Sequence, residues 1–228
     1  MKYIRLESPV LRRKELDFEA FGYDIKRTLY LVPPSELRPK SFWRVFDSRR
    51  TRREFKALGK NHLSALLWYS SKTGTCKRLR SGYLWQHKPT PSAGGRHSID
   101  IIVCNYKRNF DSLELYDPIS HSLGVLDIKR PIVVEKLITR IRKIIPFNEA
   151  TLIFFAAQFQ KTLASYKNGE SLVWRDSGAL LATLYFVSEA MNLNCCGIGI
   201  TTEPFLSEAL GSDGLVLGTG GCLVGRRI

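Results

Sequence analysis

The sequence predicts one α+β domain that follows an extended amino-terminal segment. Patterns typical of strands and of helices both occur, but they do not alternate regularly as in a doubly wound parallel sheet. The chain has 228 residues, 44% of them apolar, which is enough to bury one sizeable core. Residues 1–40 are charged and rich in turn formers, including Pro33, Pro34 and Pro39. We therefore expect an arm over residues 1–40 and the folded domain over residues 41–228.

The first half of the domain is expected to hold one helix and three strands. Apolar spacing over residues 63–69 predicts a helix with Asn61 as its cap. A loop from Ser70 to Ser98 follows, and its length favours a functional role. The β-branched run at 99–106 is typical of a buried strand. Segments 113–116 and 123–126 flank the turn Asp117-Pro118-Ile119-Ser120, which predicts an antiparallel hairpin.

The second half contains the most apolar helix of the chain. Asp176 or Ser177 is expected to cap it, and it continues to Met191 with apolar residues nearly all round, as in a helix buried in a core or in a dimer interface. The remaining patterns predict a helix at 132–145, a strand at 151–157, an extended segment at 196–202, a short helix at 203–210 and a final strand at 215–225.

Composition excludes several classes of protein. No apolar run approaches the roughly 20 residues that cross a bilayer, and residues 1–14 lack the apolar stretch of a signal peptide, so we expect a cytoplasmic protein. The five cysteines are odd in number and have no metal-ligand spacing, so reduced thiols and no metal site are expected. The adjacent Cys195 and Cys196 are interpreted as core residues, because vicinal disulfides are strained.

The formal charge of +14 favours phosphates, nucleic acid or acidic peptides as partners. Aromatic residues near basic runs, such as Trp43, Tyr83 and Trp85, are compatible with nucleic-acid binding. The sequence has no helix-turn-helix, zinc-finger or RNA-recognition signature, however, so nucleic acid is not expected as a partner.

Two basic segments are candidates for holding a phosphate group. Arg49-Arg50-Thr51-Arg52-Arg53 offers fork-shaped guanidinium donors and a hydroxyl, although such a run is also common on solvated surfaces. The chain ends on Arg226 and Arg227 before a final isoleucine. If this terminal pair lies beside Arg49 and Arg53, the four side chains form a phosphate clamp.

Two glycine-containing segments are candidates for contact with a flat ligand. Pro91-Ser92-Ala93-Gly94-Gly95-Arg96-His97 precedes a predicted strand, and its small residues let backbone amides approach a ligand, although a structural tight turn is the alternative. Cys196-Gly197-Ile198-Gly199-Ile200-Thr201 has the same property and is also compatible with a packed strand.

Taken in order, these motifs resemble the nitroreductase-like flavoprotein superfamily, and within it the SagB-type dehydrogenases that oxidise thiazoline and oxazoline rings in peptides. The resemblance covers about residues 42–227. It rests on the Arg-x-Thr-x-Arg start, the Pro-Ser-Ala-Gly-x-x-His loop, the helix that contains Gly178, and Leu115-Tyr116-Asp117 with His121-Ser122-Leu123.

This resemblance implies a nitroreductase-like fold, with a central, mostly antiparallel sheet flanked by helices. It also implies FMN at the interface of a homodimer, where each active site is built from two subunits. The ribityl phosphate would be held by Arg49, Arg50, Thr51 and Arg53 together with Arg226 and Arg227. The isoalloxazine ring would contact Pro91, Ser92, Ala93, Gly94, Gly199 and Ile200.

One position differs from the azoline dehydrogenases. They carry a Lys-Tyr pair for proton transfer, whereas this chain has Ser165-Tyr166 followed by Lys167. Tyr166 matches the family tyrosine, and Lys167, His97 or Lys161 would have to replace the lysine as base. The expected function is therefore azoline oxidation with a peptide substrate or peptide-modifying partner enzymes. The alternatives are a nitro or quinone reductase that NAD(P)H visits transiently, and a flavin-fold scaffold without catalysis.

Overall fold

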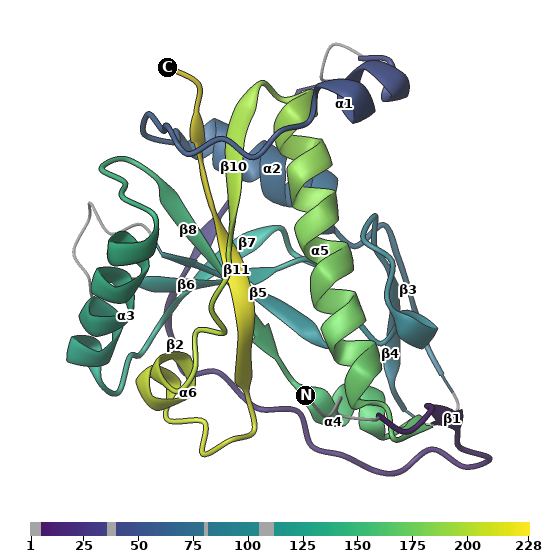
Figure 1. Ribbon diagram of the computed structural model, residues 1–228. Coiled ribbons are helices and arrows are strands. Elements are labelled where there is room, and N and C mark those ends of the chain that lie inside the picture. Colours follow the sequence, from purple (N-terminus) through teal and green to yellow (C-terminus); the bar gives the residue numbers. More distant parts are fainter. Residues whose placement is uncertain (1–5, 36–39, 80–81, 105–111) are drawn as a thin grey trace.

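The computed structural model describes residues 6–35, 40–79, 82–104 and 112–228, and it confirms the α+β class. Its centre is a seven-stranded sheet, antiparallel throughout, with the order β10-β11-β8-β5-β6-β7-β2 (Figure 1). The strands of this sheet are β2 (Ile25–Tyr30), β5 (Ile99–Cys104), β6 (Leu113–Asp117), β7 (Ser122–Leu126), β8 (Thr151–Ala157), β10 (Leu193–Ile198) and β11 (Leu217–Arg226).

Helices cover both faces of the sheet, so the core has two halves. On one face α2 (Lys60–Ser71) and α5 (Glu170–Ala190) pack through residues such as Leu66 and Leu184. On the other face α3 (Pro131–Ile144) and α6 (Phe205–Leu210) pack through residues such as Ile138 and Leu206. Figure 1 shows α3 and α6 on one side of the sheet and α5 on the other.

The strands β8 and β11 form the middle of this core. Every residue of β8 is buried, which explains its uninterrupted apolar sequence, since both of its faces are covered. A side chain at Gly221 of β11 would collide with the backbone of Ile153 in β8, so the close approach of the two strands requires glycine there. The predicted hairpin at 113–126 is confirmed as β6 and β7.

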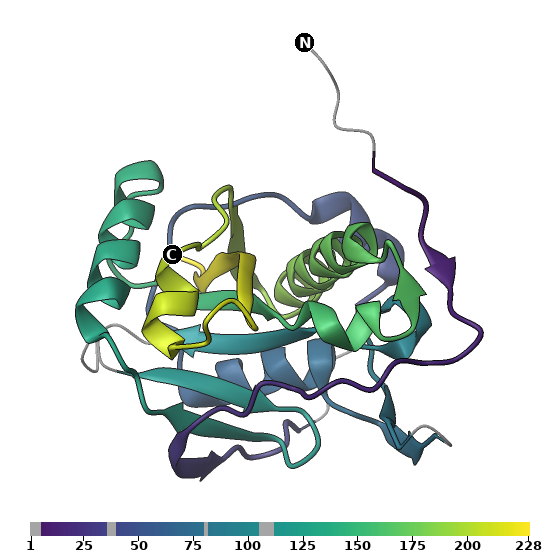
Figure 2. The ribbon, with the colours of Figure 1, turned by 90° about the horizontal axis from the view of Figure 1, so that it is seen from below.

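The amino-terminal segment, residues 6–35, runs along the outside of the domain (Figure 2). Its strand β1 (Val10–Leu11) pairs with β9 (Tyr166–Lys167), and β2 forms the edge strand of the central sheet beside β7. The sequence of β2 has no clear alternation because the strand is mostly exposed, and its pairing with β7 is a tertiary contact that local patterns do not report.

Several boundaries differ from the expected ones; the expected extended segment 196–202, for example, is the strand β10, which begins at Leu193 and ends at Ile198. Helix α5 begins at Glu170 after Gly169 rather than at Asp176 or Ser177, because its first turns are partly solvent-facing and lack a continuous apolar pattern. Helix α2 begins at Lys60 after Gly59, so Asn61 lies inside it and caps nothing. The strand β5 covers residues 99–104 of the expected strand 99–106, and residues 105 and 106 lie outside the described residues.

The expected loop 70–98 also contains regular structure. The hairpin of β3 (Thr75–Arg78) and β4 (Leu84–His87) and the short 3-10 helix η1 (Ala93–Gly95) lie within it. All four residues of β3 are exposed, so its sequence shows no alternation of apolar and polar residues.

The five cysteines are free, and Cys195 and Cys196 are buried as predicted. Over the described part of the chain, no helix is long and apolar enough to cross a membrane.

Candidate functional site

Helix α5 connects the two groups of residues that the sequence motifs single out. The basic segments lie at its carboxyl-terminal end around Glu189, and the Pro-Ser-Ala-Gly-Gly loop lies beside Asp176 in its first half. These two anchor residues are thirteen positions apart on the helix. With a rise of about 1.5 Å per residue, the two groups in one chain are separated by about 20 Å along the helix.

Both ends of the domain meet at the first group. The backbones of Lys56 and Arg226 exchange two hydrogen bonds, of 3.0 and 2.9 Å, and the Arg52 amide donates to the Cys195 carbonyl at 3.2 Å. The arginine-rich segment therefore lies beside β10 and β11, and the structure brings Arg49 to Arg53 and the terminal Arg226 and Arg227 to the same end of the sheet.

Glu189 organises the cations of this group. Its side chain is only 5% exposed, and its two carboxylate oxygens accept from Arg52 at 2.5 Å and from Arg227 at 2.8 Å. Burial on its own would raise the pKa of Glu189, but the hydrogen bonds from Arg227, Arg52 and Ser48 outweigh burial and lower it. Glu189 thus fixes two guanidinium groups.

Tyr185 links the arginine-rich segment to the second glycine segment. The guanidinium carbon of Arg49 lies 5.4 Å from the centre of the Tyr185 ring. The Tyr185 hydroxyl lies 3.2 Å from the Thr51 hydroxyl and accepts a 2.7 Å hydrogen bond from the Gly197 amide. Arg50, in contrast, donates to the carbonyls of Asp47 and Arg49, so it is turned back on its own segment.

The amides of Gly199 and Ile200 are accessible to a ligand. Among the described residues, no acceptor takes a hydrogen bond from either amide. A Cβ atom built on Gly199 would meet no atom within 4 Å, so a planar molecule has open space above this backbone. Arg53 lies close enough to Cys196, which precedes this segment, to oppose the increase that burial causes in the pKa of that thiol.

The second group is the Pro-Ser-Ala-Gly-Gly loop, which Asp176 of α5 holds in place. One Asp176 oxygen accepts from the Ser92 hydroxyl at 2.5 Å, and the other accepts from the Ala93 amide at 3.0 Å. The Ser92 oxygen in turn accepts from the His97 amide at 2.8 Å. Gly94 and Gly95 have φ angles of 59° and 64°, the left-handed conformation that favours glycine. The conformation of the loop is therefore set by the carboxylate and by the two glycines.

Of the four candidate proton-transfer residues, Lys161 forms a 3.0 Å ion pair with Asp100, and the other three lie in different surroundings. The Tyr166 hydroxyl lies beside Gly94 of the loop, where a Cβ atom built on the glycine would be only 2.8 Å from it. Lys167, its neighbour in β9, is exposed. His97 makes a 3.0 Å hydrogen bond from Nε2 to the Gln86 carbonyl, and burial and nearby Lys88 lower its pKa to about 4, so its ring is neutral at pH 7. Of the three, only Tyr166 and His97 are close to the loop.

Comparison with known proteins places this arrangement in a family. Residues 47–226 match the sequence profile of the Nitroreductase family. The chain belongs to the nitroreductase family. Comparison with curated proteins gives no match.

Solved structures similar to this nitroreductase-family chain share its fold at low sequence identity. A proposed nitroreductase from Ralstonia eutropha JMP134 has 19% identity and a TM-score of 0.67 over 97% of this chain and 99% of its own. The Escherichia coli microcin synthetase McbBCD complex with truncated pro-MccB17 bound has 15% identity and a TM-score of 0.60 over 85% and 75%. A proposed nitroreductase in complex with FMN from Desulfovibrio desulfuricans has 14% identity and a TM-score of 0.50 over 83% and 87%.

Sequence reasoning missed the residues that organise the site of this nitroreductase-family chain. Asp176 was predicted as a helix cap, but the helix starts earlier and its carboxylate holds the loop. The sequence motifs assign no role to Glu189 and Tyr185 of the apolar helix or to Arg52, although all three hold parts of the site. The signal that identifies both Asp176 and Glu189 is an acidic residue within a mostly apolar helix sequence. Such a residue is expected to be buried, and a buried carboxylate needs hydrogen-bond or ion-pair partners. Among the described residues, no cluster of three or more metal-binding side chains occurs.

Proposed function

We propose that this nitroreductase-family protein is an FMN-dependent oxidoreductase that works as a homodimer. The observation that carries the proposal is the position of two complementary groups at the two ends of one helix. The group at the carboxyl-terminal end of α5 is cationic and offers free amides, which suits the phosphate and the polar ring edge of FMN. The Pro-Ser-Ala-Gly-Gly loop near the amino-terminal end of α5 is rich in small residues and is held by Asp176, which suits the flat isoalloxazine ring.

The residues present fit FMN. Arg49, Arg53 and the Thr51 hydroxyl would hold the phosphate, together with Arg226 and with Arg227, whose orientation Glu189 fixes. The free amides of Gly199 and Ile200 would face the polar edge of the ring. Bound FMN would supply the hydride chemistry, while the protein orients it and excludes competing reactions. The FMN-bound neighbour from Desulfovibrio desulfuricans supports this assignment at the level of the fold.

A twofold dimer along α5 would complete the site. The outward face of α5 carries Gly178 and Ala182, both exposed, and at Gly178 a Cβ would meet nothing within 4 Å. The apolar surface continues onto α1 (Phe42–Ser48), where Trp43 is 69% exposed. Contiguous exposed apolar surface of this kind marks an interface. Two antiparallel copies of α5 would bring the cationic group of one chain against the loop of the other, since a twofold contact is reciprocal.

For the reaction, we propose the oxidation of azoline rings in a peptide, which would place the chain in the SagB-type branch. In this reaction a hydride and a proton leave the ring, so the protein must accept the proton. Tyr166 lies against Gly94 of the loop, where it would face a substrate that is stacked on the flavin. The fold shared with a chain of the McbBCD microcin synthetase complex, which was solved with a truncated pro-peptide, supports a peptide substrate or peptide-modifying partners.

A specific observation favours the reduction of nitro compounds or quinones as the second candidate. Lys167 is exposed, and His97 is a weak base because burial lowers its pKa to about 4. Neither side chain replaces the family lysine well. Reduction by a flavin that has received hydride from NAD(P)H needs little more than an open site, so it tolerates the loss of that base.

The two reactions are separated by assaying the purified protein with FMN. A thiazoline-containing peptide in air would lose two hydrogens per ring, which mass spectrometry detects, and Tyr166→Phe would slow this reaction while retaining FMN. NADH or NADPH with a nitroaromatic compound or a quinone tests the second candidate. Turnover of the second kind alone, unaffected by Tyr166→Phe, would select the reductase. A protein that binds no FMN would contradict both.

A further inference from the structure

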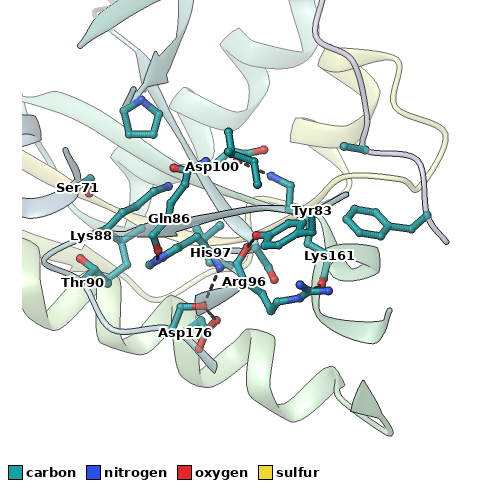
Figure 3. A pocket seen from close by; sticks show the side chains of 18 of the residues that line it. Ser71, Tyr83, Gln86, Lys88, Thr90, Arg96, His97, Asp100, Lys161 and Asp176 are labelled. Atoms are coloured by element: carbon teal, nitrogen blue, oxygen red, sulfur yellow. Dashed lines mark hydrogen bonds and ion pairs between the residues drawn. The ribbon is translucent and has the colours of Figure 1, made fainter. Parts of the chain in front are cut away.

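A cavity of about 770 Å³ lies behind the Pro-Ser-Ala-Gly-Gly loop, on the side of the amino-terminal segment (Figure 3). Its walls are residues 14–20 of that segment, the strand β4 with the residues that follow it, and the start of β5. Pro91 and Ser92 of the loop also line it. The volume is in the range of small-molecule sites, which is about 300–1,000 Å³.

Most of the charged groups in this cavity are neutralised by the protein itself. Lys161 forms a 3.0 Å ion pair with Asp100, whose second oxygen accepts from Tyr23 at 2.9 Å and from Gln158 at 2.6 Å. Arg96 pairs with Glu15 of the amino-terminal segment. Asp176 is used by the loop. None of these groups therefore needs a ligand.

Lys88 is different. It follows β4 and extends along the cavity towards Asp100, as Figure 3 shows. Over the described part of the chain, no residue accepts a hydrogen bond from the Lys88 ammonium or forms an ion pair with it. Burial lowers the pKa of Lys88 to about 8, which reports how poorly its charge is compensated. A desolvated cation without a partner is costly, and an anion that entered the cavity would remove this cost.

We propose that this cavity binds a small organic monocarboxylate, whose carboxylate pairs with Lys88 and whose apolar body fills the rest of the space. Lys14 also lines the cavity, but its side chain is exposed to solvent, so Lys88 is the one unpaired and partly buried cation among the described lining residues. One such cation matches one carboxylate, whereas a phosphate dianion is usually held by several donors. The rest of the lining includes Leu16, Phe18, Ile99 and Leu180, which suit an apolar body. Lys88 belongs to neither group of residues proposed to hold the flavin, whereas Pro91 and Ser92 border both this cavity and the proposed flavin site.

The test is isothermal titration of the purified full-length chain with 3-phenylpropanoate, with its neutral amide 3-phenylpropanamide and with inorganic phosphate. We expect the carboxylate to bind at least about tenfold more tightly than the amide, and phosphate to bind more weakly than the carboxylate. Lys88→Met should weaken binding of the carboxylate about ten- to a hundredfold and leave the amide unchanged. Lys136→Met on α3, outside the cavity, should change neither.

The pH dependence of the unmodified chain gives a second test that needs no variant. Only the ammonium form pairs with a carboxylate, so affinity should be flat between about pH 6 and 7, where the ligand stays ionised, and should fall about thirtyfold between pH 6.5 and about pH 9.5, above the lysine pKa near 8. The charged groups near enough to shift the pKa of Lys88 are Asp100, Lys161 and Asp117, and Lys88 in turn lowers the pKa of His97. The pKa of His97, about 4, keeps that ring neutral over this range.

Three results would overturn the proposal. The first is equal binding of the acid and the amide, or binding of neither. The second is an affinity for the acid that Lys88→Met leaves unchanged in a variant that unfolds at the same temperature as the parent. The third is tighter binding of phosphate than of the carboxylate, which would assign the cavity to a different anion. Repeating the titrations with and without added FMN separates a failure of this proposal from a failure of the FMN assignment.

Discussion

Asp176 is predicted to control FMN binding through the loop that it holds, although it would not touch FMN itself. Asp176→Leu keeps the approximate size of the side chain and removes both acceptors. The Ala93 amide and the Ser92 hydroxyl, now bonded at 3.0 and 2.5 Å, then lose their partner. Asp176→Asn is the matched variant, because its carbonyl oxygen can still accept from Ala93 while its NH2 group donates to the Ser92 oxygen.

The size of the effect follows from the two hydrogen bonds. At about 1–1.5 kcal/mol net for each, Asp176→Leu should lower the free energy of unfolding by about 2–3 kcal/mol. Burial raises the pKa of Asp176, and the two hydrogen bonds oppose this increase. The buried charge therefore carries a desolvation cost, and Asp176→Leu removes that cost together with the hydrogen bonds. We expect a loss of stability near the lower end of the range. The loop would then have to be ordered when FMN binds, so FMN affinity should fall about thirtyfold.

The assays are urea unfolding for stability and quenching of flavin fluorescence for FMN affinity. Glu170→Gln, a change of one exposed acid at the start of the same helix, is the control and should alter the free energy of unfolding by less than about 1 kcal/mol. We expect Asp176→Asn to stay close to the parent in both assays. The reasoning would be refuted if Asp176→Leu bound FMN as tightly as the parent, or if Asp176→Asn lost as much affinity as Asp176→Leu.

Three further predictions concern α5. Ala182→Arg should dissociate the proposed dimer in analytical ultracentrifugation and weaken FMN binding more than tenfold, whereas Thr139→Arg on the exposed face of α3 should do neither. Glu189→Gln should lower the free energy of unfolding at pH 7 by about 2–3 kcal/mol, less than for a fully buried pair because its two arginines are about a third exposed. The folded-state pKa of Glu189 is lowered, so this stabilisation is fully present above the unfolded-state pKa and is lost as the pH falls through the folded-state pKa. Parent and variant should therefore converge in urea unfolding once the pH is below the folded-state pKa of Glu189. Tyr185→Phe should reduce FMN affinity about tenfold by fluorescence titration, since the Gly197 amide loses its acceptor.

The sequence predicts those parts of the fold in which buried positions produce a run or a regular spacing of apolar residues. The strands β5 and β8 are fully or largely buried and were recognised from their apolar runs, and the turn at Asp117 identified the hairpin of β6 and β7. The sequence does not identify the strands β2 and β3. Most of their residues are exposed, so apolar residues do not alternate with polar ones along these strands. Their pairing depends on partners that lie elsewhere in the chain.

The candidate site was predictable as a set of motifs but not as an arrangement. The glycines at 94 and 95 do adopt the left-handed conformation for which glycine is suited, and the two basic segments do meet. The sequence does not identify the supporting residues Asp176, Tyr185 and Glu189. The spacing of apolar residues predicts which face of a helix is buried, but it does not predict the loop with which a polar side chain of that helix forms hydrogen bonds. The cavity behind the loop could not be foreseen, because residues 14–20 cover it from a distant part of the sequence.

The central claim is that this nitroreductase-family chain uses FMN, and titration of FMN into the flavin-free protein tests it most directly. The measurement compares the parent with Arg49→Ala combined with Arg53→Ala, and with Arg140→Ala combined with Lys143→Ala, which removes the same charge from α3. We predict one FMN per chain, an affinity at least about a hundredfold weaker in the first double variant, and parent-like binding in the second. A parent protein that binds no FMN, or equal binding by all three proteins, would contradict the account.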